Sequence, residues 1–195
     1  FEAELWSAVP KAAAPKLIEA PPPPPAPPPP APTPAPPAPV VKAPDADIAL
    51  PTACEQLSSP AMFAALQAKG PLNDPGVTMT STQNVTGLEL LSSGVPTIRC
   101  SWGLPGDSGM VTNVTIVDAA QSEAILTALT EAGFACGAEL GGTVCRFAQS
   151  MINQDDEIAE LTETQVLRGN AWVTTYTINF AVDGYTEDLV AAIWG

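Results

Sequence analysis

Residues 165–180, QVLRGNAWVTTYTINF, carry the strongest structural signal in the chain. Two runs, residues 165–168 and 172–180, are rich in the residues that strands favour. Between them lies Gly169-Asn170, a dipeptide that suits a tight turn. The stretch therefore predicts a β-hairpin, and the pattern from Tyr185 to Trp194 predicts a helix that follows it.

Upstream of this hairpin, a second pair of strands and two helices are expected. Residues 97–102 alternate so that every second side chain is apolar, which indicates a strand. A loop rich in Gly and Pro, residues 103–109, returns the chain into a strand at 111–117. Apolar residues at helical spacing predict a helix over 119–132, and the Ser-Ser-Pro sequence at 58–60 predicts the start of another.

These elements predict an α+β fold, in which helices pack on one face of an antiparallel sheet. Aligning residues 110–133 with residues 172–195 without a gap gives six identities. A duplicated hairpin-plus-helix unit is therefore a further hypothesis. Shared strand propensity could produce nearly as many identities, so we expect the two units to superpose only if the duplication is real.

The four cysteines, Cys54, Cys100, Cys136 and Cys145, occur in a chain without histidine and without a C-x-x-C motif. This pattern favours disulfides over a zinc site or a redox motif, and disulfides indicate an oxidising, extracytoplasmic compartment. Of three possible pairings we prefer Cys54–Cys100 with Cys136–Cys145, because the last two lie in an expected hairpin. Four reduced, buried cysteines in a cytosolic protein are the alternative.

Proline divides the chain, since 17 of the 23 prolines precede residue 45. Each proline fixes φ and lacks an N–H donor, so this part should remain a solvated, extended polyproline II segment. We expect a membrane-proximal head at residues 1–20, a disordered proline-rich linker at 21–50 and a folded domain at 51–195. Residues 21–44 would hold their flanks up to roughly 75 Å apart. Because the apolar runs of the head are too short to span a bilayer, any membrane anchor is expected upstream of Phe1.

Residues 4–10 (ELWSAVP), the proline run and residues 45–50 (DADIAL) resemble the segment that follows the membrane helix in proteobacterial TolA. This resemblance covers about 50 residues and implies a periplasmic protein, anchored in the inner membrane, whose partners are other envelope proteins. The chain departs from the family where a globular domain begins at once, without the long helix of TolA. An N-terminal segment joined to an unrelated domain is the alternative.

Charge and composition exclude several classes of function. Residues 51–195 contain sixteen Asp and Glu against four Lys and Arg, a net charge of −12 (4 − 16), which opposes binding to nucleic acid. Without histidine, Ser-His and Cys-His nucleophile arrangements are impossible. The cluster of Asp155, Asp156, Glu157, Glu160 and Glu163 lacks the spacing of an EF-hand loop and is interpreted as a solvated acidic face. We therefore expect no catalytic residues, no metal and no cofactor.

Three aromatic residues, Trp102, Trp172 and Tyr176, are candidate binding residues. The alternative, core packing, is the more frequent role of such residues in strands. The favoured function is a noncatalytic envelope protein that presents a protein-binding domain on a stiff tether. A secreted or surface-anchored domain that binds or senses a small ligand is the alternative.

Overall fold

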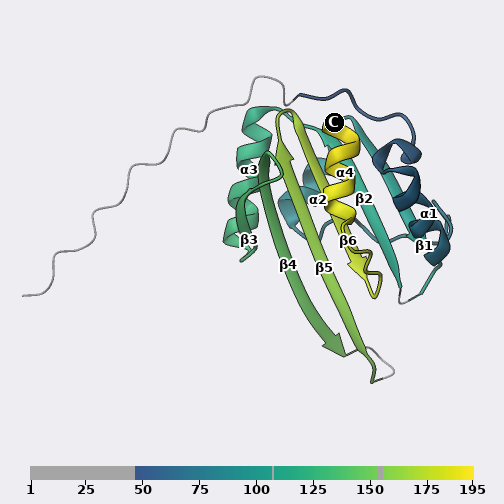
Figure 1. Cartoon of the computed structure of the whole chain (residues 1–195). Helices are drawn as coiled ribbons and strands as arrows, with labels where there is room; N and C mark the ends of the chain where they lie inside the picture. The colour runs from purple at the N-terminus through teal and green to yellow at the C-terminus, as the bar shows by residue number, and fades with distance from the viewer. Residues whose placement is uncertain (1–46, 107, 153–155) are drawn as a thin grey trace, which may run out of the picture. The chain divides into compact units, whose positions relative to one another are not determined.

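Six antiparallel strands form one sheet in the order β1-β2-β6-β5-β4-β3 (Figure 1). The structure is a computed structural model and describes residues 47–106, 108–152 and 156–195. The strands are β1 (Thr97–Gly103), β2 (Gly109–Ile116), β3 (Ala135–Glu139), β4 (Gly142–Ile152), β5 (Ile158–Arg168) and β6 (Ala171–Ile178). The helices are a short 3₁₀ helix η1 (Cys54–Leu57), α1 (Pro60–Lys69), α2 (Val85–Ser92), α3 (Ala119–Glu131) and α4 (Tyr185–Trp194).

The hairpin predicted from residues 165–180 is confirmed as β5 and β6. Its register pairs Arg168 with Ala171, so Gly169 and Asn170 form the turn. Gly169 has a φ of 57°, a left-handed conformation that glycine adopts without steric cost. β5 begins at Ile158, seven residues before the predicted run, and its first part pairs with the far end of β4.

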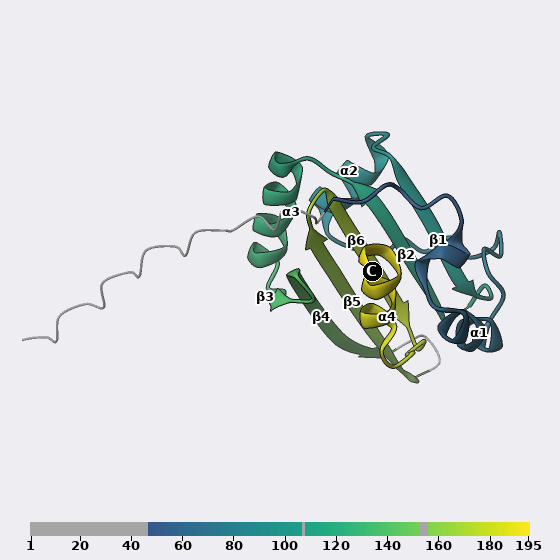
Figure 2. The same cartoon turned by 45° about the horizontal axis from the view of Figure 1, so that its top comes forward.

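The sheet has an apolar core on each face. On the first face, which we call the α4 face, Cys100, Trp102, Met110 and Val173 pack against Leu189 and the other buried residues of α4, η1 and α1. On the second, the α3 face, Cys145, Leu167 and Trp172 pack against α3, with α2 beside it. Figure 2 shows α4 in front of the sheet and α2 behind it.

The α+β class and the antiparallel sheet are confirmed, but the helices cover both faces, not the single face expected. The reason lies in β2 and β6, whose side chains are almost all buried on both faces. Such a sheet needs helices or loops on both faces, because exposing either apolar face to water would be unfavourable.

The hypothesis of a duplicated unit is not supported, because α3 and α4 lie on opposite faces of the sheet. β2 and β6 are antiparallel neighbours. A two-fold axis that exchanged them would run through the sheet and would leave both helices on the same face. The six identities between the segments therefore reflect shared strand and helix propensity.

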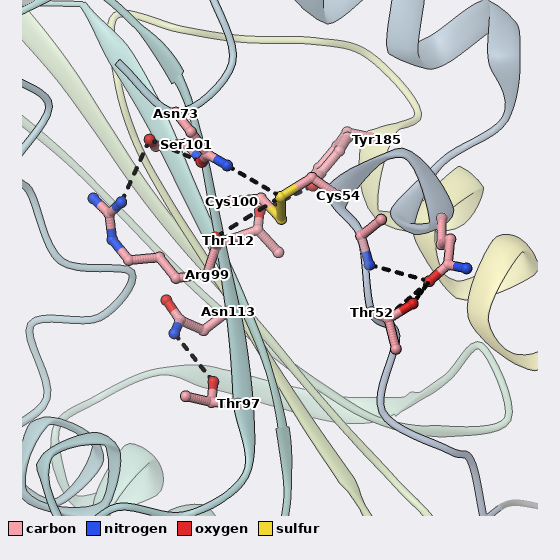
Figure 3. Close-up of a disulfide and its surroundings, with 12 residues drawn as sticks. Thr52, Cys54, Asn73, Thr97, Arg99, Cys100, Ser101, Thr112, Asn113 and Tyr185 are labelled. Carbon is pink, nitrogen blue, oxygen red and sulfur yellow. Dashed lines mark hydrogen bonds between the residues drawn. A yellow bond between two sulfur atoms is a disulfide. The ribbon is translucent and has the colours of Figure 1, made fainter. Parts of the chain in front are cut away.

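Both disulfides of the preferred pairing are present, and they indicate an oxidising, extracytoplasmic environment. Cys54–Cys100 joins η1 to the middle of β1, with Asn73 donating a hydrogen bond to the Cys54 sulfur (Figure 3). Cys136–Cys145 joins β3 to β4. No helix of the described residues has the length and apolarity needed to cross a membrane.

The compact unit starts earlier than residue 51. Ile48 exchanges two hydrogen bonds with the Asn170 side chain, and both Ile48 and Leu50 pack against the α4-face core. The last residues assigned to the linker therefore belong structurally to the domain. The expected head and the proline run lie outside the described residues.

The two disulfides should differ in how readily they are reduced in the native protein. Cys54, Cys100 and Cys145 are buried, whereas Cys136 lies exposed on β3. An attacking thiolate can reach only the Cys136 sulfur without unfolding the domain. We expect a mild dithiol to open Cys136–Cys145 first, with alkylation and peptide mass spectrometry as the measurement. Equal reduction of all four cysteines would contradict this.

The two tyrosines of the chain should ionise at a higher pH in the folded domain than in the unfolded chain, and the buried Tyr185 should ionise only when the domain unfolds. Burial raises the pKa of Tyr185 above the ordinary value of 10.0, although its hydrogen bond with Thr112 opposes the shift. Burial and the nearby Glu163 carboxylate raise the pKa of Tyr176. Both pKa values are higher in the folded state than in the unfolded state. The contribution of the two neutral tyrosines to the free energy of unfolding is therefore fully present below pH 10 and is lost as the pH rises above this value. The phenolate absorbance of Tyr185 should therefore appear above pH 10 only together with loss of near-ultraviolet circular dichroism. Ionisation of both tyrosines before unfolding would be inconsistent with the burial of Tyr185.

Candidate protein-binding edge

β4 extends well beyond its outer neighbour β3 (Figure 1). β3 pairs only with residues 142–146, whereas β5 pairs with β4 as far as Ile152. The outer side of residues 147–152 therefore has no strand beside it in the described part of the chain. We call these residues the open β4 segment.

Local packing fixes the point at which β3 begins. The Phe134 ring lies 5.3 Å from the Phe147 ring, where the chain arrives from α3 and enters β3. The Cys136–Cys145 disulfide and the Glu139–Arg146 ion pair, 2.8 Å between Nη2 and Oε2, then hold β3 against β4. The hydrogen bond from Arg146 also lowers the pKa of Glu139. β3 is thus held at one end of β4 and leaves the other end open.

The antiparallel pairing shows which backbone groups of the open β4 segment point outward. Cys136 and Cys145 lie opposite each other with a Cα–Cα distance of 4.0 Å, which corresponds to the close, non-hydrogen-bonded kind of pair. The N–H and C=O groups of Cys145 therefore point towards β5. Because the direction alternates along a strand and the register with β5 is unbroken, those of Ala148, Ser150 and Ile152 point away from the sheet.

The side chains of the open β4 segment lack the features that usually prevent another strand from pairing with a sheet edge. Its sequence, Phe-Ala-Gln-Ser-Met-Ile, contains no charge and no proline. Met151 is 50% exposed and Ile152 is 71% exposed, and Ile158 opposite Ile152 is 67% exposed. Natural proteins commonly protect an edge with lysine, proline or a bulge. None of these devices occurs in residues 147–152.

At the opposite edge of the sheet, in contrast, the chain itself covers the last part of β1. Residues 71–73 run beside β1, where Asn73 donates its backbone N–H to the Ser101 carbonyl at 2.7 Å and Gly103 donates to the Pro71 carbonyl. The Asn73 side-chain oxygen accepts from the Ser101 N–H at 2.9 Å (Figure 3). Residues 71–73 therefore cover Ser101 to Gly103 at this edge, whereas no described segment pairs with the open β4 segment.

A buried carboxylate lies on the α3 face, where a solvated acidic residue was expected. Glu163 is only 3% exposed and accepts hydrogen bonds from Thr82 Oγ1, the Gln83 backbone N–H and Gln165 Nε2. Gln165 in turn accepts from the Trp172 indole at 2.7 Å. The prediction of a solvated acidic face is wrong for Glu163, because the segment around Thr82 covers this side chain. Glu160 is exposed, and Asp155 lies outside the described residues.

A second concave feature lies on the α4 face, where a cavity of about 280 Å³ separates the start of α4 from β5 and β6. Its lining includes several threonine side chains together with Arg146, Asp183 and Glu187. Several of the hydroxyls bond one another, as Thr162 with Thr177 and Thr175 with Thr112. The cavity is polar, but most of its hydroxyl groups already have partners.

The described residues contain no group of three or more Cys, Asp or Glu side chains placed to hold a metal ion. All four cations of residues 51–195 contact other groups of the domain. Lys69 lies over Phe180, Arg99 donates to two carbonyls, Arg146 pairs with Glu139 and Arg168 lies over Trp194.

The structure places the predicted binding residues in the interior. Trp102 and Trp172 have no exposed surface, and Tyr176 is almost as deeply buried. They belong to the α4-face core, the α3-face core and a small cluster with Met79, respectively. This position agrees with the core-packing alternative. The four cysteines all form disulfides.

The sequence interpretation missed the open β4 segment. A signal was available, because Cys145, Phe147 and Met151 fall at even spacing on one side of a strand. It was weakened by Ala148, Gln149 and Ser150, which have little strand preference.

Removing the Glu163 carboxylate should destabilise the domain. In Glu163→Ala, the buried Thr82 hydroxyl would lose its carboxylate acceptor, and the Gln83 N–H and Gln165 Nε2 would each lose a hydrogen bond. We expect a loss of about 2–4 kcal/mol in the free energy of unfolding. Glu163→Gln retains one acceptor oxygen and should lose less, and the exposed Glu160→Gln should change little. Urea denaturation measures all three, and a Glu163→Ala variant as stable as the wild type would refute the network.

No protein-family model matches the chain, and no curated protein matches it either, so the candidate edge must be interpreted from its own geometry.

Proposed function

We propose that this chain is a noncatalytic, extracytoplasmic protein that binds a partner protein by adding one of the partner's strands to the open β4 segment. The observation that carries the proposal is the combination of outward-pointing backbone groups at Ala148, Ser150 and Ile152 with uncharged side chains. An extended segment docked there would gain main-chain hydrogen bonds and bury Met151 and Ile152.

The general part of the proposed location, outside the cytoplasm, is supported by the disulfides. Its more specific part is supported only by the sequence resemblance. The two disulfides support an oxidising compartment outside the cytoplasm. The TolA-like pattern of residues 1–50 supports the more specific proposal of a periplasmic, membrane-anchored protein whose anchor lies upstream of Phe1. In that arrangement the proline run carries the domain away from the membrane towards other envelope proteins.

A catalytic role has less support than binding. The chain has no histidine, and the most deeply buried acid described, Glu163, is fully occupied by hydrogen bonds and lies beneath the segment that contains Thr82. Groups that take part in general acid–base chemistry must reach a substrate. Glu163 instead stabilises the fold.

A small-ligand or sensor function is the second candidate, and the threonine-lined cavity of about 280 Å³ favours it. Thermal unfolding in the presence of a metabolite panel tests this function. A rise in melting temperature that Thr164→Val abolishes would favour the cavity over the edge.

The edge itself is tested by a proline substitution whose effect on folding should be small. Ser150→Pro removes an N–H that points away from β5, and proline is tolerated at such edge positions. We expect the variant to remain folded and to lose at least about tenfold in affinity for its partner. The measurement is capture from an envelope extract on the immobilised chain, followed by titration of the captured protein.

Ser150→Ala is the matched control, because it removes the hydroxyl that bonds Glu160 but keeps the backbone N–H. It should bind nearly as well as the wild type. If Ser150→Pro binds its partner as tightly as Ser150→Ala does, strand addition at this edge is excluded.

A further inference from the structure

We propose that the segment bound by the open β4 segment is a strand of alternating basic and apolar residues, with a Lys or Arg opposite Ser150 that pairs with Glu160. This inference rests on the proposed function and adds the chemistry of the partner. It follows from the different side chains that β4 presents on the two faces of the sheet.

On the α4 face, the open β4 segment presents two small side chains, Ala148 and Ser150, and then the exposed Ile152 at its end. On the neighbouring strand β5, Thr162 pairs with Ala148 and Glu160 pairs with Ser150. Small residues on β4 leave room for a long side chain of an added strand to cross them. A partner side chain opposite Ser150 therefore faces Glu160 over the Ser150 hydroxyl.

The distances allow this contact. An added strand would lie one strand spacing from β4 and two from β5, about 10 Å from the β5 backbone. A Lys or Arg side chain and a Glu side chain extended towards each other span that separation. Glu160 is exposed, and the Ser150 hydroxyl donates to its two oxygens at 2.8 and 2.9 Å, which holds the carboxylate above β4.

On the α3 face the requirement is different. Phe147 and Met151 are partly exposed there, with the exposed Gln149 between them, and Phe147 packs against the Phe134 ring. The α3-face side chains of an added strand would cover this apolar surface and should themselves be apolar. Since successive side chains of a strand point to opposite faces, the two requirements together demand alternation.

The charge around the edge also favours a basic partner. Asp156 and Glu157 lie in the hairpin turn beyond Ile152. Arg146, the cation that adjoins the open β4 segment, is paired with Glu139, and Lys69, Arg99 and Arg168 contact groups elsewhere in the domain. The chain carries a net charge of −14. An acidic strand, or a second copy of this chain, would be repelled, whereas a basic strand is attracted.

A displayed library of random decapeptides, selected on the immobilised full chain, tests the inference. We expect the enriched peptides to alternate apolar residues with Lys or Arg. A synthetic peptide of the enriched sequence should bind Glu160→Gln about two- to fivefold more weakly than the wild type, as is typical of an exposed ion pair. Selection on Glu160→Lys should replace the basic residue at one position by Asp or Glu.

The other outcomes overturn the inference in distinguishable ways. Peptides that lose binding in Ser150→Pro but show no basic preference would refute the basic partner and leave strand addition intact. A dimer of the full chain in light scattering that Ser150→Pro disrupts would make the occupant a second copy. Failure to enrich any peptide, or peptides that bind Ser150→Pro unchanged, would refute the proposed function together with this inference.

Discussion

The pairing of β2 with β6 is the constraint on which the rest of the structure depends. These strands lie far apart in the sequence, pair along their full length and are buried on both faces. Met110 and Val173 contribute to the α4-face core, and Trp172 contributes to the α3-face core. Once this central pair forms, β1 can lie only beside β2 and β5 only beside β6. The edges of the sheet are then determined, and with them the candidate binding surface.

Polar contacts within the two cores fix the register of that central pair. Thr112 of β2 bonds both Thr175 of β6 and the Tyr185 hydroxyl of α4. On the other face, Trp172 donates to Gln165, which contacts the Glu163 carboxylate. A slip of one residue would send each of these groups to the opposite face and leave them buried without partners. The hydroxyl and amide networks therefore contribute to specificity as well as to stability.

Local features of the fold were predictable from the sequence, and long-range ones were not. The β5–β6 hairpin follows from the Gly169-Asn170 turn, and α3 from apolar spacing and an Asp118–Gln121 capping box. The disulfide pairing followed from the hairpin context of Cys136 and Cys145. The placement of the helices on both faces could not be predicted from the sequence. Trp172 and Val173 are neighbours on one strand and are both buried, and only the tertiary packing shows that helices cover each face. Burial of Glu163 depends on Thr82, which lies 81 residues away.

The open β4 segment also has a colloidal consequence. An uncharged strand edge can pair with its copy on another molecule, and nothing within residues 147–152 prevents it. What keeps molecules apart at neutral pH is the charge of the chain as a whole, −14. This repulsion weakens as carboxylates are protonated towards the isoelectric point near pH 4.1, and high salt screens it. The net negative charge therefore limits association through the open β4 segment. In many other β proteins, lysine or proline within the edge strand has this effect.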